Sequence, residues 1–71
     1  MKIVDTLDQA VELQEQLPVR FIVRREGESI ARPLFVLCSN DFHAAEFTAW
    51  EIVKNRGIKN AVVTFEVTLR G

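Results

Sequence analysis

The sequence predicts one small α+β domain, residues 1–71, built from four strands and two helices in the order βαββαβ. Three observations predict this class. Two helix-like segments follow capping residues, two apolar runs flank a glycine turn, and in the last segment apolar and polar residues alternate. With 71 residues and a hydrophobic content of 48%, the chain is near the lower size at which a single core supports a fold.

The first eighteen residues predict a short strand and a helix. The stretch KIV, residues 2–4, directly precedes a helix cap and is expected to be a strand; without it the order is αββαβ with a three-stranded sheet. Thr6 and Gln9 have the spacing of a capping box, and Pro18 ends the helix. One helical face gathers apolar side chains, with Leu13 on its flank: Leu7, Ala10, Val11 and Leu17.

Residues 19–38 predict a β-hairpin. Apolar residues alternate with others over residues 19–24, Glu26 and Gly27 supply the turn, and LFVLC, residues 34–38, forms the second strand. Pro33 lies at the start of this second strand. Because proline has no amide hydrogen, it predicts a bulge or an unpaired position there.

Residues 42–56 predict the second helix, and the chain ends in a strand. Ser39, Asn40 and Asp41 are three candidate N-caps, and Gly57 is the expected residue after the helix C-terminus. The helical periodicity predicts a buried stripe of Phe42, Ala45, Ala49, Ile52 and Val53. In the last strand, Val63, Phe65, Val67 and Leu69 alternate with Thr64, Glu66, Thr68 and Arg70.

This element order is that of the ferredoxin-like arrangement, in which two helices cover one face of a four-stranded antiparallel sheet. The other face is then open. If the inward-facing residues of the second hairpin strand are Leu34, Val36 and Cys38, Phe35 and Leu37 point to the open face beside Ile22. A central strand covered on both sides is also apolar throughout, so this pattern leaves both interpretations open.

Charge and composition limit the function classes. The net charge is −1, which gives no general attraction to nucleic acid or to a membrane surface. Residues 1–18 are acidic, whereas residues 19–37 carry four arginines against two glutamates. No export leader precedes the domain, the apolar runs are too short to span a membrane, and the single Cys38 has no partner for a disulfide. A cytoplasmic location is therefore expected.

Phe47 and Trp50 do not fall on the buried stripe of the second helix. Measured from Phe42, Trp50 lies about 80° around the helix and Phe47 about 140°. Two interpretations follow. Both aromatics pack into the core beneath the hairpin, or they form with the stem of Lys54 an aromatic and cationic patch typical of binding interfaces.

The sequence carries no recognisable catalytic or metal-binding motif. One pair combines a nucleophile with a nearby base: Cys38 and His43, at a strand-to-helix turn. No third group can be assigned to orient them. Two candidate ligands do not build a zinc site, and no glycine-rich loop is present to hold a phosphate. We expect no enzymatic activity, no cofactor and no metal.

The sheet is also that of the RNA recognition motif, which the stretch ARPLFVLC resembles in part. Phe35 and Val36 align with the Phe-Val pair of that family, but Pro33 and Leu34 replace an aromatic and a glycine. The resemblance implies nucleic-acid binding as an alternative function. Its candidate residues in the hairpin are Arg20, Arg24 and Arg32.

The order of hairpin, helix and strand also resembles that of several small phage-encoded inhibitors, including some anti-CRISPR proteins. The resemblance covers most of the chain and rests on element order and size. It implies a non-enzymatic protein-binding module that occupies a surface on a partner complex. The expected partners are a protein of unknown identity and a second copy of the chain, and the candidate binding residues are Phe47, Trp50, Lys54, Ile22 and Phe35.

Overall fold

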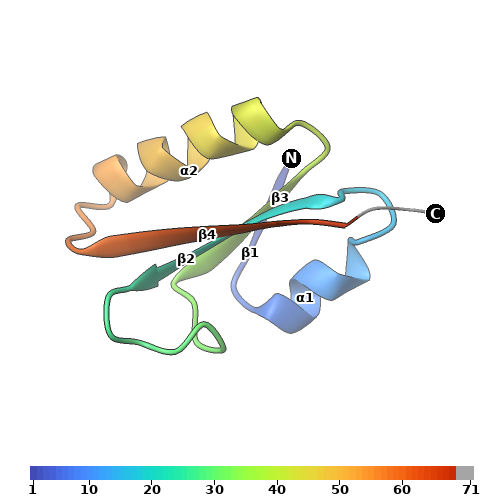
Figure 1. Cartoon of the computed structure of the whole chain (residues 1–71). Coiled ribbons are helices and arrows are strands. Elements are labelled where there is room, and N and C mark those ends of the chain that lie inside the picture. The colour runs from blue at the N-terminus through green and yellow to red at the C-terminus, as the bar shows by residue number, and fades with distance from the viewer. Residues whose placement is uncertain (69–71) are drawn as a thin grey trace.

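The computed structural model describes residues 1–68 and has the order βαββαβ that the sequence predicts (Figure 1). The elements are β1 (Lys2–Val4), α1 (Leu7–Glu12), β2 (Val19–Arg25), β3 (Phe35–Ser39), α2 (Phe42–Asn55) and β4 (Ala61–Val67). The short first strand is therefore confirmed. Leu69 and Arg70, which the alternation places in the last strand, lie outside the described residues.

The four strands form one antiparallel sheet in the order β1-β3-β2-β4. β2 and β3 are the central strands, and β1 and β4 form the two edges. β2 pairs with β4 along its whole length, from Val19 opposite Val67 to Arg25 opposite Ala61. The strand order is not that of the ferredoxin-like arrangement, because there the last strand lies beside the first.

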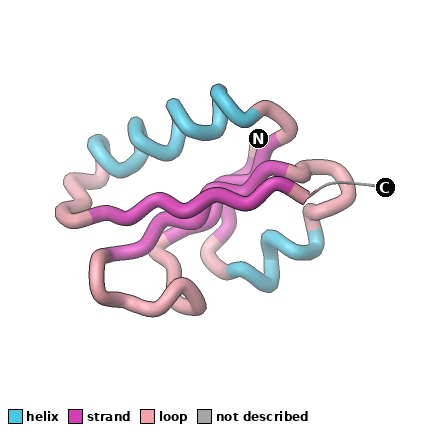
Figure 2. The backbone as a smooth tube through the Cα atoms, in the orientation of Figure 1, coloured by secondary structure: helices cyan, strands magenta, loops and turns pink. Residues whose placement is uncertain are grey.

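The two helices lie on opposite faces of the sheet, so the expectation that both cover one face is wrong. Figure 2 shows α2 above the strands and α1 below them. The strand order explains this difference. The connections β1-α1-β2 and β3-α2-β4 both cross one strand in the same direction along the sheet, but β1 and β3 are antiparallel. Right-handed crossovers from antiparallel strands in the same direction place their helices on opposite faces.

Each face consequently has its own core, and neither face is open. Under α2 lie Val19, Phe21, Val23, Phe35 and Leu37, with Ala45, Ala49 and Val53 from the helix. Under α1 lie Ile22, Val36 and Cys38, with Ala10 from the helix. The expectation that Phe35 and Leu37 point to an open face beside Ile22 is therefore wrong. All three are fully buried, and Ile22 faces the opposite side from the other two.

The first helix is capped as expected but ends earlier. Thr6 Oγ1 accepts a hydrogen bond from the Gln9 amide at 3.2 Å, and the Thr6 amide donates to Gln9 Oε1 at 3.2 Å. The helix ends at Glu12, and turns continue the chain towards Pro18. Its apolar stripe is centred on Ala10 and includes Leu13, so Val11 is 54% exposed and does not join the core.

The second helix follows the sequence prediction closely. Asp41 is the N-cap, and its Oδ1 accepts a hydrogen bond from the Ala44 amide at 3.1 Å. Gly57 follows the C-cap with φ of +64°, a conformation that glycine adopts without steric cost. The expected stripe is confirmed, with Phe42 and Ile52 packed at the margins of the core. Pro33 lies outside β3, in the connection between the hairpin strands.

Candidate protein-binding surface

Phe42, the first residue of α2, joins the helix to β4 through ring contacts. Its centroid is 5.0 Å from that of Phe65, with the rings nearly perpendicular, and 5.1 Å from that of Phe21. Phe21 and Phe65 are direct neighbours across β2 and β4, with centroids 5.8 Å apart. The three rings run from the buried core to the surface, since Phe21 is buried, Phe42 half-buried and Phe65 exposed.

β4 is covered only in part. α2 packs mainly across β2 and β3, and α1 packs across β3 and β1. Ala61 and Val63 of β4 are half-buried at the margin of the core under α2. Phe65 is 56% exposed and Val67 is 47% exposed.

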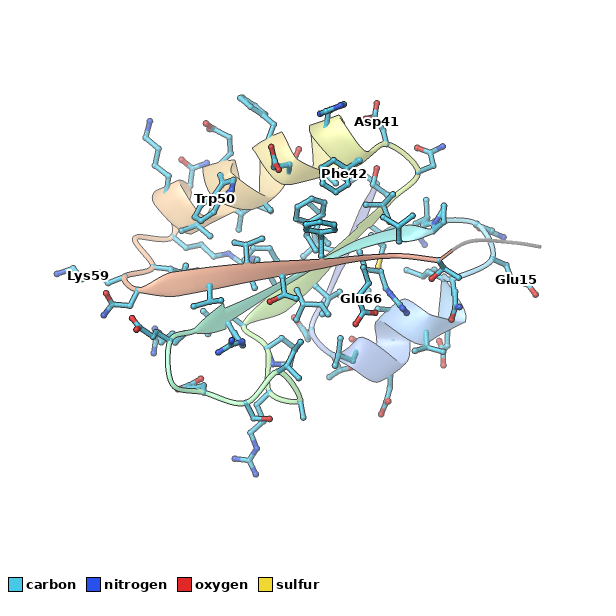
Figure 3. The ribbon with its side chains drawn as sticks, in the orientation of Figure 1. Glu15, Asp41, Phe42, Trp50, Lys59 and Glu66 are labelled. Atoms are coloured by element: carbon cyan, nitrogen blue, oxygen red, sulfur yellow. The ribbon has the colours of Figure 1, made fainter. Side chains whose placement is uncertain are left out.

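Trp50 and Phe47 are two further exposed aromatic residues, on the helix that lies on the same side of the sheet. Trp50 is 49% exposed and Phe47 is 69% exposed. The two are neighbours on the helix surface because they are three residues apart, and Lys54 follows Trp50 by one turn. Figure 3 shows Trp50 and Phe42 on the side of α2 that overhangs β4. We call this region the aromatic surface; its residues are Phe42, Phe47, Trp50, Phe65 and Val67.

The structure brings together some of the candidate binding residues and excludes others. Phe47, Trp50 and Lys54 lie exposed along one side of α2, as the second interpretation of the helical periodicity expects. Ile22 and Phe35 are buried in separate cores and are not part of any surface. Sequence reasoning missed Phe65 and Val67. Their alternation places them on the α2 side, but their exposure depends on the strand order, which local patterns do not encode.

The arginines proposed for nucleic-acid binding lie away from the aromatic surface. Arg20 and Arg24 flank Ile22 on β2 and so point to the α1 side of the sheet. Arg20 Nη2 donates to Glu66 Oε2 at 2.8 Å, and Arg24 Nη1 donates to the Glu28 carbonyl at 2.9 Å. The third candidate, Arg32, is exposed in the connection between β2 and β3.

Cys38 and His43 do not form a catalytic pair. Cys38 is buried on the α1 side, whereas His43 is exposed on α2, on the other side of the sheet. Burial raises the pKa of the Cys38 thiol, and the nearby Arg20 charge opposes this shift only in part. Ser39 is held locally, since its hydroxyl accepts from the Asp41 amide at 3.0 Å. Within residues 1–68, no three His, Cys, Asp or Glu side chains gather as a metal site would require.

No helix among the described residues has the length and apolar character needed to cross a bilayer. Comparison of the chain with models of protein families, with curated proteins and with solved structures found no match.

Proposed function

We propose that this chain is a non-enzymatic protein-binding module that acts by occupying a surface on a partner through its aromatic surface. The observation that carries the proposal is the exposure of Phe47, Trp50 and Phe65 around one helix and one edge strand. Isolated exposed apolar residues are common, but several large aromatics on one side of a small domain are typical of an interaction site.

Trp50 is suited to be the central contact. Tryptophan is enriched among residues that dominate binding energy, because it buries a large area and loses little conformational freedom. Lys54 and Phe47 flank it, so a partner with an apolar pocket and an acceptor placed to meet Lys54 fits this region. Small phage-encoded inhibitors act in this way, and we propose that class as the biological setting.

Nucleic-acid binding is the alternative, and the arrangement of side chains favours it less. Proteins that bind single strands place stacking aromatics and cationic side chains along one groove. Here Arg20 and Arg24 point to the α1 side and already have acceptors within the chain, whereas the exposed aromatics lie on the α2 side.

The test compares affinity capture by three forms of the full chain from a bacterial lysate, with and without nuclease treatment. The forms are the wild type, a double variant with Phe47→Ala and Trp50→Ala, and a matched control, Val11→Ala. Val11 is exposed to a similar degree but lies on α1, on the other face of the sheet. We expect the wild type and the control to capture the same protein, and the double variant to lose it.

Two results would contradict the proposal. One is capture of the same protein by the double variant at wild-type yield. The other is capture that disappears on nuclease treatment, together with binding of labelled single-stranded RNA or duplex DNA at low salt. That result would favour nucleic-acid binding through the side of the sheet that carries Arg20 and Arg24.

A further inference from the structure

The outer edge of β4 exposes backbone groups that no other described strand pairs with. The Glu26 amide donates to the Asn60 carbonyl at 2.8 Å, and the Thr68 amide donates to the Pro18 carbonyl at 2.9 Å. Since antiparallel partners alternate between bonded and non-bonded positions, the even-numbered residues of β4 bond to β2. The amides and carbonyls that point to the free edge belong to Ala61, Val63, Phe65 and Val67.

Nothing in the sequence of β4 protects this edge. The strand has seven residues, contains no proline or glycine, and carries Glu66 as its only charged side chain. That carboxylate is already paired with Arg20 inside the chain. Soluble proteins usually block edge strands with lysine, proline, a bulge or a short length. The opposite edge follows this rule, because β1 has three residues and begins at Lys2.

We infer that a second copy of this chain pairs with β4 in antiparallel orientation, about a twofold axis that passes between the two Thr64 residues. An isologous contact needs a strand that is complementary to itself. In this register every residue from Ala61 to Val67 has a partner, so the whole strand is paired. The two sheets then become one continuous sheet.

On the α2 side the pairs are apolar. Val63 lies opposite Phe65 of the second copy, and Ala61 lies opposite its Val67. Aromatic and β-branched residues opposite each other stabilise antiparallel pairs. The contact therefore covers part of the Phe65 ring that remains exposed beside Phe42.

On the α1 side the charges are complementary. Across β2 and β4 of one chain, Arg24 lies opposite Val62, and Arg20 lies opposite Glu66. In the paired sheet, Val62 lies opposite Glu66 of the second copy. Each Glu66 consequently lies between two arginines. Arg20 of the same chain is on the neighbouring strand, and Arg24 of the second copy is two strands away on the other side.

The neighbouring registers that retain the hydrogen-bonding pattern are less favourable. A twofold axis at Phe65 leaves Ala61 opposite a position beyond Thr68, and an axis at Val63 leaves Val67 opposite Lys59, outside the strand. An axis at Glu66 also places two carboxylates directly opposite each other, which destabilises strand pairing. The register centred on Thr64 is the one that pairs every residue of β4.

The pairing also adds to the proposed binding role, although it does not depend on it. A twofold axis perpendicular to the sheet leaves both α2 helices on the same side. With a strand spacing of about 4.8 Å, and α2 lying across β2 and β3, the helix axes are roughly 20 Å apart. The two aromatic surfaces then form the walls of one groove, whose floor is the paired β4 strands.

The test combines oligomeric state with a register-specific cross-link. Thr64 and its counterpart form a non-hydrogen-bonded pair, with Cα atoms about 4.5 Å apart, which suits a disulfide. We expect Thr64→Cys to form an intermolecular disulfide under mild oxidation, with the buried Cys38 unreactive. The matched control, Val62→Cys, lies on the same face, but its counterpart is more than about 10 Å away across the axis. It should remain uncross-linked.

Sedimentation equilibrium of the wild type should give twice the chain mass at high concentration. Thr64→Glu should be monomeric, with an unchanged circular dichroism spectrum, and mixing it with Thr64→Lys should restore the dimer. A wild type that stays monomeric overturns the inference, as does equal cross-linking of Thr64→Cys and Val62→Cys. Neither result bears on whether Phe47 and Trp50 bind a partner, so the two proposals fail separately.

Discussion

The ring of Phe42 lies edge-on to the ring of Phe65, with centroids 5.0 Å apart and planes at 86°. Phe42 starts α2, and Phe65 is in the middle of β4. This contact links α2 to β4, the edge strand on that side of the sheet. It therefore contributes both to stability and to the shape of the aromatic surface.

A double-mutant cycle on Phe42→Ala and Phe65→Ala should measure this link. We expect a coupling free energy of about 0.5–1.5 kcal/mol, the range for perpendicular aromatic pairs beyond their buried area. Phe42→Ala should be the more destabilising single change, since its ring is also 5.1 Å from that of the buried Phe21. Urea denaturation of the four proteins provides the measurement, and purely additive effects would show that the rings are not coupled.

Removing Phe47 and Trp50 together should leave the fold intact. Exposed substitutions usually change stability by about 0.5 kcal/mol or less, and the half-exposed Trp50 raises the expected total to about 1 kcal/mol. Leu37→Ala, a fully buried control, should cost about 2–5 kcal/mol. Thermal melts of the three proteins decide between the two interpretations of these aromatics. If the double variant is unfolded at room temperature, the interpretation that both residues belong to the core is the right one.

The stability of the chain should fall at alkaline pH because of Cys38. Burial raises the pKa of this thiol, so the folded chain holds the proton more tightly than the unfolded chain does. The free energy of unfolding is therefore unaffected below about pH 8.5, where an unfolded thiol ionises, and falls by up to about 1.4 kcal/mol per pH unit above it.

Denaturation at a series of pH values from 7 to 10 should reveal this fall, and Cys38→Ala should abolish it. The chain contains no tyrosine, so no phenol titrates in the same range. Parallel pH profiles for the wild type and Cys38→Ala would argue against a thiol that is protonated in the folded state.

Glu66→Gln should cost about 1 kcal/mol at low salt. The change leaves the Arg20 guanidinium, whose side chain is 12% exposed, without its carboxylate acceptor at 2.8 Å. The difference from wild type should shrink in 1 M salt, because the other partner is half-exposed and therefore screened. Glu46→Gln removes an exposed carboxylate on α2 and serves as the control. A loss at residue 66 that is independent of salt would mean that packing, not charge, is lost.

Gly57→Ala should destabilise the chain by about 1 kcal/mol through the backbone alone. The residue has φ of +64°, and a Cβ built there meets no atom within 4 Å. Gly57→Asn should cost less, because asparagine tolerates this conformation better than other residues with a side chain. Chemical denaturation of both variants would test the order, and equal costs would contradict the backbone explanation.

Local sequence patterns predicted the elements and the N-caps of both helices, but not the end of α1 at Glu12. Thr6 with Gln9, Asp41, and Gly57 mark helix termini by hydrogen bonds and backbone conformations that involve only neighbouring residues. The order of elements followed from these patterns. Long-range pairing decides which edge of the sheet the last strand joins. Local patterns therefore could not predict which face of the sheet each helix covers.

The stretch LFVLC illustrates this difference. An apolar residue at every position fits a strand covered on both faces, and it also fits a strand with one face left for a partner. The choice depends on whether α1 crosses to the other side of the sheet, which follows from the position of β4. For the same reason the exposure of Phe65 could not be predicted. Phe47 and Trp50 could be identified because helical periodicity alone sets their positions on α2.

The unequal neighbours of β3 should divide its amides into two hydrogen-exchange classes. β3 aligns with β1 over three residue pairs and with β2 over five, and β1 is tied to a helix of only six residues. Local opening of β1 with α1 needs less free energy than global unfolding, so amides that donate to β1 exchange through that opening. Amides that donate to β2 exchange only when the whole domain unfolds. Because donors of a central antiparallel strand alternate between its neighbours, fast and slow positions should follow one another residue by residue along β3.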